Sequence, residues 1–152
     1  MRYLVWLLIS ASCATSPEAP LSSATLTVNP AAHSARAQPG VVTLAGASLH
    51  KWTVTFATIE GCTGDTSASV EIETLASQTA IPTGVIQLRA DQTDAGTLPS
   101  AYLSYMASPL VSGAITINSA SEGFVTGSLS SMLMVGGVAT DVSGTFSAPT
   151  CP

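Results

Sequence analysis

This chain has few cysteine, histidine and carboxylate side chains, which serve as thiol nucleophiles, proton carriers and metal ligands, and they are widely spaced. It holds three cysteines, two histidines and nine acidic residues among 152. His33 and His50 stand far from one another, and no Gly-x-Ser-x-Gly motif presents a serine nucleophile. Members of a Ser-His-Asp triad can be distant in sequence, so a hydrolase stays open as an alternative. We predict no catalytic residue.

Carboxylates and metal ligands follow no recognised spacing. Glu71 and Glu73 share one face of a predicted strand about 7 Å apart, a separation compatible with a glycosidase pair, but we expect both on a solvated face. The polar loop from Asp91 to Gly96 offers oxygens for Ca²⁺ without the spacing or closing Glu of an EF-hand. Two cysteines and two scattered histidines show no zinc spacing. We therefore predict no metal and no cofactor.

Aromatic side chains suggest a second alternative, a carbohydrate- or protein-binding module. Trp52, Tyr102 and Tyr105 would form a stacking platform if all were exposed. Trp52 alternates with Val54 and Phe56, which favours a place in the core. The pattern does not decide whether Tyr102 and Tyr105 are exposed or buried.

The N-terminus has the order of an export signal. Arg2 precedes the apolar run Tyr3 to Ile9, and small residues follow. The run is too short to span a bilayer, which takes about 20 apolar residues. We predict a signal peptide over residues 1–12, and the alternative is a buried N-terminal strand.

Ser10-Ala11-Ser12-Cys13 resembles the bacterial lipobox, usually Leu-Ala-Gly/Ser-Cys, with Ser10 as the departure. The resemblance implies cleavage before Cys13 and acylation of its thiol. Residues 13–23 would then be the anchor and a flexible tether rich in Ala, Ser and Pro. Ala14 lacks the Asp that retains lipoproteins in the inner membrane, which points to the outer membrane. Cleavage after Ala14, giving a periplasmic or secreted protein, is the alternative.

Cys62 and Cys151 remain as two cysteines available for pairing, whether the chain is cleaved before Cys13 or after Ala14. Export compartments oxidise thiols, so we predict a disulfide between Cys62 and Cys151. It would close a loop of roughly 90 residues, worth about 4–5 kcal/mol in the chain-entropy model. Neither cysteine lies in a Cys-x-x-Cys motif or beside a basic cluster that would activate its thiol.

The net negative charge of the chain limits the classes of partner that it can bind. The chain has four Lys and Arg against nine Asp and Glu, a formal net charge of -5. Nucleic acid is excluded as a partner because phosphate binding needs a basic face. Contact with a membrane is expected through the lipid alone, and the remaining partners are an envelope protein or a glycan. We expect a structural or interaction role.

Short alternating runs separated by Gly and Pro predict an all-β domain over residues 24–152. The runs place Val70 and Ile72 inward, then Ile86 and Leu88, then Ile115 and Ile117. Residues 31–40, including His33, are expected to form a loop or a short helical turn. Gly136-Gly137 predicts a two-residue hairpin turn. Eight or nine strands without an amphipathic helix indicate an antiparallel β-sandwich or a flattened barrel.

The C-terminal part resembles the ending of small uncharacterised lipoproteins of myxobacteria and their relatives. The likeness rests on residues 123–129, on Gly136-Gly137, and on the Gly-x-Phe-x-Ala-Pro-x-Cys pattern that ends at Cys151. It implies an exported location and an all-β fold, and it brings no catalytic residue.

Overall fold

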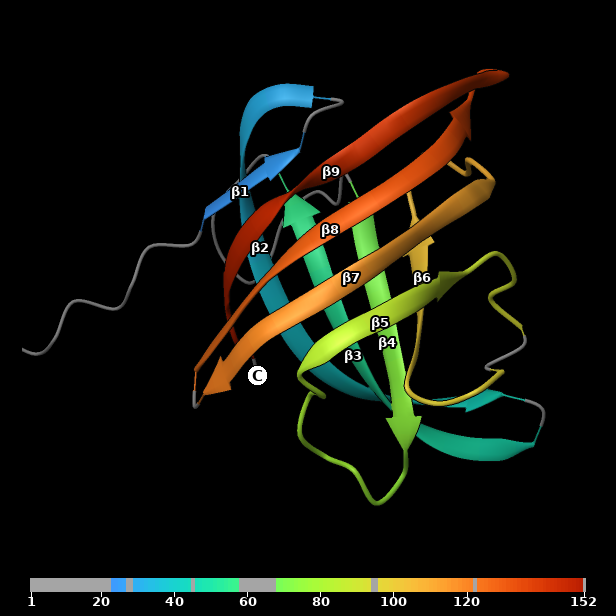
Figure 1. Ribbon diagram of the computed structural model, residues 1–152. Helices are drawn as coiled ribbons and strands as arrows, with labels where there is room; N and C mark the ends of the chain where they lie inside the picture. The colour runs from blue at the N-terminus through green and yellow to red at the C-terminus, as the bar shows by residue number, and fades with distance from the viewer. Residues whose placement is uncertain are drawn as a thin grey trace, which may run out of the picture.

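The structure is a computed structural model that describes residues 23–26, 29–44, 46–57, 68–93, 96–121 and 123–151, with side chains from Ala35 on except that of Ala57. Every regular element in these ranges is a strand (Figure 1). The strands are β1 Ser23–Leu26, β2 Asn29–Leu44, β3 Ala47–Ala57, β4 Ala68–Leu75, β5 Gly84–Arg89, β6 Ser100–Ser104, β7 Leu110–Ser121, β8 Phe124–Val135 and β9 Val138–Pro149. The prediction of an all-β fold is confirmed.

The strands form a closed barrel in the order β1-β2-β3-β4-β6-β5-β7-β8-β9. The short strand β1 closes the ring, because Ala24 pairs with His33 of β2 on one side and with Phe146 of β9 on the other. A parallel bridge between Ala37 and Thr150 also joins β2 to the segment after β9. Of the two predicted architectures, the barrel is the one observed.

One connection departs from a simple up-and-down meander. The chain leaves β5, crosses through residues 90–99, and returns as β6 between β4 and β5. As a result β5 and β6 run parallel, with Leu88 opposite Ala101 and Arg89 opposite Tyr102. All other strand pairs are antiparallel.

The barrel interior is filled by apolar side chains from alternate positions. Phe56 and Phe146 meet edge to face at its centre, with ring centroids 5.6 Å apart. The inward positions predicted by alternation are correct, since the following side chains are buried or packed against the core: Trp52, Val54, Val70, Ile72, Ile86, Leu88, Ile115 and Ile117.

The prediction of a loop over residues 31–40 is wrong. These residues, His33 among them, lie in the 16-residue strand β2. Pro39 is tolerated there for a geometric reason: Ala37 accepts a bond from Cys151 N–H on the side away from β3, and backbone groups two residues apart point the same way. The N–H that Pro39 lacks would therefore point away from β3, so the pairing of β2 with β3 loses no hydrogen bond.

The hairpin of β8 and β9 turns at Gly136-Gly137, as predicted. Both glycines have positive φ, 59° and 83°, the combination that a type I′ turn requires at its two central positions. The hairpin reaches beyond β7 at the upper right of Figure 1. In the described part of the chain, no helix is long and apolar enough to cross a membrane.

Candidate functional site

Charged side chains gather on the outer face of β4, β6 and β5. They lie beside the connection from β5 to β6, residues 90–99, which we call the crossing connection. Arg89 at the end of β5 reaches Glu73 on β4 over the start of β6. Its Nη1 bonds Glu73 Oε2, and its Nη2 donates to Glu73 Oε1 at 2.7 Å. Ser100 of β6 accepts from Nη1 at 2.7 Å and donates to Glu73 Oε2 at 3.3 Å. We call Glu73, Arg89 and Ser100 the ionic clamp.

The clamp also holds the connection that follows β5. Arg89 Nε donates to the carbonyl of Asp91 at 2.6 Å, and Nη2 donates to the carbonyl of Gln92 at 3.1 Å. Together with the bonds to Glu73 and Ser100, these account for all five N–H groups of the guanidinium. Arg89 therefore has no donor left for an anionic ligand, although a depression of about 460 Å³ lies beside it.

The expected solvated position of Glu73 is wrong. Its side chain points to the outer face of β4, as the alternation predicted, but the residue is only 1% exposed. Arg89 pairs with it and is itself bonded to the carbonyls of Asp91 and Gln92 at the start of the crossing connection. The bidentate ion pair offsets the cost of removing a carboxylate from water.

Glu71, the other outward carboxylate of β4, keeps partial exposure. Its Oε1 accepts from Lys51 Nζ at 3.0 Å, and its Oε2 accepts from Gln92 Nε2 at 3.3 Å. Glu71 and Glu73 thus serve two ion pairs with separate cations. Each carboxylate is held by its own ion pair, and the two do not converge on one point as a glycosidase pair would.

Asp91 organises the turn that begins the crossing connection. Its Oδ1 accepts from the Thr93 backbone N–H at 2.8 Å and from the Thr93 hydroxyl at 2.7 Å. These two bonds, with a smaller contribution from the charge of Arg89, hold the pKa of Asp91 below its usual value of 3.8. The described part of the chain contains no group of three or more His, Cys, Asp or Glu side chains suited to a metal ion.

An apolar hollow lies at one end of the barrel, and we call it the Trp52 hollow. It measures about 240 Å³ and is lined by Trp52, Ala80, Ile81, Ala120, Ser121, Val125 and Thr150. The connection from β4 to β5 forms one wall and is fixed in place. Trp52 Nε1 donates to the Thr79 carbonyl at 3.2 Å, Thr74 Oγ1 donates to the Gln78 carbonyl at 2.9 Å, and Ile81 is buried.

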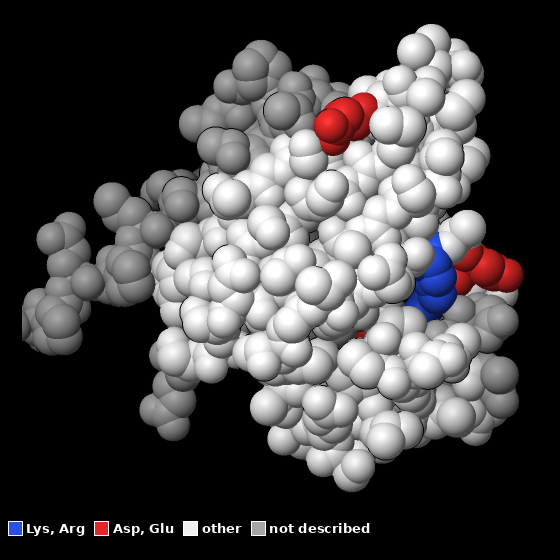
Figure 2. Space-filling view, viewed as in Figure 1, with Lys and Arg blue, Asp and Glu red and all other residues white. Residues whose placement is uncertain are grey.

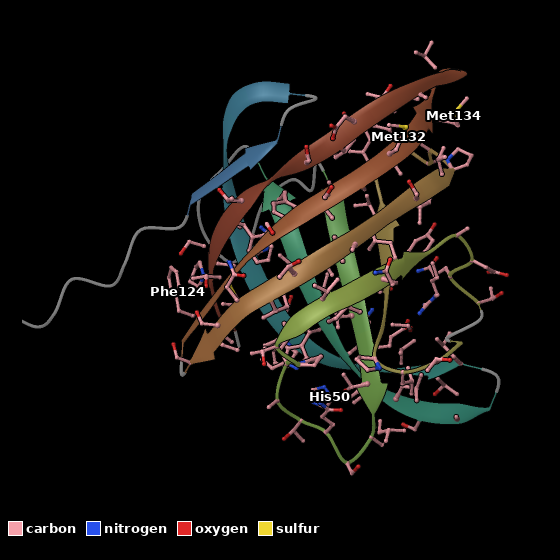
Figure 3. All side chains as sticks on the ribbon, viewed as in Figure 1. His50, Phe124, Met132 and Met134 are labelled. Atoms are coloured by element: carbon pink, nitrogen blue, oxygen red, sulfur yellow. The ribbon has the colours of Figure 1, made fainter. Side chains whose placement is uncertain are left out.

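His50 packs beside Trp52, with ring centroids 6.2 Å apart. Its Nδ1 is buried and has no hydrogen-bond partner among the residues that the structure describes. Figure 3 places His50 and Phe124 toward one end of the barrel, and Met132 and Met134 toward the other. Within the described ranges, neither a carboxylate nor a serine bonds the His50 Nδ1, so these residues do not form a triad with this ring through that atom.

The other predicted residues fall in several places. Cys13 and Cys62 lie outside the described residues, so lipidation and the disulfide stay predictions. Cys151 is buried, and its N–H donates to the Ala37 carbonyl at 2.7 Å. Tyr105 is buried and Tyr102 half-buried. The three aromatic rings therefore do not form an exposed platform.

The sheet face formed by β7, β8 and β9 is nearly free of charge. Asp141 is the one charged residue in these three strands. Figure 2 shows this face as a mostly white surface with a few charged points near its borders. Hydroxyls of Ser and Thr occupy many of its outward positions, as in the row of Thr116, Ser128 and Thr145 across the three strands.

Comparison with known proteins gives no match to a protein-family model, to a curated protein or to a solved structure. The likeness of the C-terminal residues to myxobacterial lipoproteins therefore stays a prediction.

The ionic clamp and the Trp52 hollow are what sequence reasoning missed. Arg89 is one of only four cations in the chain, which was the available hint of a buried pair. The hollow left no comparable signal, because its lining comes from five separate segments.

Proposed function

We propose that this chain is an exported, lipid-anchored protein of the outer membrane whose barrel serves as a non-catalytic structural or interaction module. The observation that carries the proposal is the lipobox-like Ser10-Ala11-Ser12-Cys13 that follows Arg2 and the apolar run Tyr3 to Ile9. The first described strand starts at Ser23, which is the last residue of the predicted tether of residues 13–23. All the described strands follow the predicted export signal and the predicted anchor at Cys13 in the sequence.

A non-catalytic role is supported by the use of the charged side chains. Arg89 is saturated by the ionic clamp and the backbone of the crossing connection. Lys51 and Glu71 pair with each other. These groups hold strands and connections together, which is the work of a scaffold.

The disulfide between Cys62 and Cys151 belongs to the same proposal. Cys151 is 1% exposed and lies against β2 through its bond to Ala37. Ala37 pairs with Val54 of β3, and Cys62 follows the end of β3 at Ala57 by a few residues. A stretch of about five residues spans up to roughly 17 Å, which is enough to reach across β2.

The experiment is fractionation of cells that express the chain with Cys13→Ser. We expect the wild-type chain in the outer-membrane fraction. The variant should appear in the soluble fraction or as an uncut precursor, because it has no thiol to acylate. A matched Ser12→Ala variant, which keeps a small residue before Cys13, should behave as wild type. Normal processing and unchanged membrane fractionation of Cys13→Ser would reject the anchor and favour simple secretion.

A further inference from the structure

The Trp52 hollow has the size and chemistry of a site for an alkyl group. No charged side chain lines it, and its polar side-chain groups are the hydroxyls of Ser121 and Thr150 and the indole N–H of Trp52. That N–H is already used by the Thr79 carbonyl. The volume of about 240 Å³ exceeds the roughly 150 Å³ of an engineered apolar cavity that binds benzene. The end of one alkyl chain fits such a space.

The hollow opens at the end of the barrel where the chain enters its first strand. Strand β1 runs antiparallel to β9, with Ser23 opposite Ser147 and Ala24 opposite Phe146. The chain therefore enters β1 on the side toward which β9 continues to Thr150, and Thr150 lines the hollow. Nine residues, 14–22, separate Cys13 from β1, so the two lie at most roughly 35 Å apart.

We propose that the Trp52 hollow receives the end of an alkyl chain of a membrane lipid. The proposal rests on the proposed function, because the anchor at Cys13 would hold this end of the barrel near the bilayer. Burial of the apolar wall then gives the barrel a second contact with the membrane besides the acyl anchor. The uncharged lining suits an aliphatic chain and would exclude a charged headgroup.

The first test uses the full chain carrying Trp6→Phe, so that Trp52 is its only tryptophan. The probe is 11-bromo-1-undecanol in solution, because bromine quenches indole fluorescence on contact. We expect saturable quenching of Trp52. This titration needs neither a membrane nor an acylated Cys13. A negative result would therefore count against the hollow as a binding site and leave the proposed lipid anchor untouched.

A matched pair of variants locates the effect. Ala120 lines the hollow, while Ala139 is an exposed strand residue near the hairpin turn of β8 and β9. Ala120→Phe should fill the hollow and weaken binding by about tenfold or more, a loss of about 1.4 kcal/mol. Ala139→Phe should bind as the parent does. Quenching that rises linearly without saturation, or that is equal in both variants, would overturn the site.

The second test identifies the lipid as the source. The acylated protein carrying Trp6→Phe is purified from membranes and reconstituted in vesicles of phosphatidylcholine whose acyl chains are brominated, with unbrominated vesicles as the control. We expect quenching of Trp52 by the brominated vesicles and its reduction in Ala120→Phe. If the alcohol binds but the vesicles do not quench, a membrane lipid is not the occupant and the proposal is wrong.

Discussion

Phe146 lies directly over Gly127 inside the barrel: a Cβ at residue 127 would stand 2.6 Å from Phe146 Cζ and 2.2 Å from the Thr116 carbonyl oxygen. The ring can meet Phe56 edge to face only because residue 127 has no side chain. The packing of Phe146 against Phe56 thus depends on the absence of a Cβ at residue 127.

Gly127→Ala should therefore destabilise the barrel. Overpacking costs about 1–3 kcal/mol, and the upper part of that range applies because a backbone carbonyl cannot rotate away. Urea unfolding measures the change. Gly40→Ala is the control, since its Cβ would meet nothing closer than 4.0 Å. Equal stability of the two variants would contradict this account of the core.

The ionic clamp should be far more sensitive than its exposed neighbour. Glu73→Gln removes the charge that balances a mostly buried Arg89 and should cost about 3 kcal/mol. Glu71→Gln loosens a partly exposed pair with Lys51 and should cost less than about 1 kcal/mol. Thermal unfolding of both variants makes the comparison. A larger loss of stability in Glu71→Gln than in Glu73→Gln would contradict the burial and pairing of Glu73 in the ionic clamp.

Hydrogen exchange gives the clamp a local readout. Backbone amides of the crossing connection at residues 90–93 should exchange faster in Glu73→Gln, because Arg89 would no longer be held over the carbonyls of Asp91 and Gln92. Amides of β8 should keep their protection. Uniform acceleration across the barrel would instead indicate global destabilisation.

Acid should weaken the turn at Asp91. The pKa of Asp91 is lowered by its bonds from Thr93, so its ionised form is favoured in the folded state. That contribution is fully present above the unfolded pKa near 3.8 and is lost as the pH falls through the lower folded value. Asp91→Asn keeps an acceptor but does not titrate there. Melting temperatures from pH 6 to 2 should fall less steeply for Asp91→Asn than for wild type, and parallel curves would contradict the assignment.

The sequence predicted the parts of the fold that depend on local alternation and turn chemistry. Val54 with Phe56, and Gly136 with Gly137, are examples in which neighbouring residues alone carry the signal. Glu73 was misjudged because alternation gives only the direction of a side chain. Its burial depends on β6 entering between β4 and β5 and on Arg89 arriving from the far side of that strand.

The course of β2 was missed for a related reason. Pro39 ends a strand in most sequences, and here it is tolerated because its missing N–H faces away from β3. That direction is set by the bond between Ala37 and Cys151, more than a hundred residues apart in the chain. Long-range pairing of this kind leaves no local pattern.

The predicted disulfide can be checked by alkylation without reductant. Neither Cys62 nor Cys151 should label in protein taken from the export compartment, and both should label after reduction. Cys62→Ser should lower the stability by about 2–5 kcal/mol. Ready labelling of both thiols in the folded, unreduced protein would reject the bridge.

The anchor at Cys13 is the central claim, and the mass of the mature N-terminal peptide tests it most directly. Protein purified from membranes is digested, and the first peptide is analysed by mass spectrometry. We expect a peptide that begins at Cys13 and carries the added mass of a diacylglyceryl group and further acylation. A peptide that begins at Thr15 without modification, as cleavage after Ala14 would leave it, would contradict the claim.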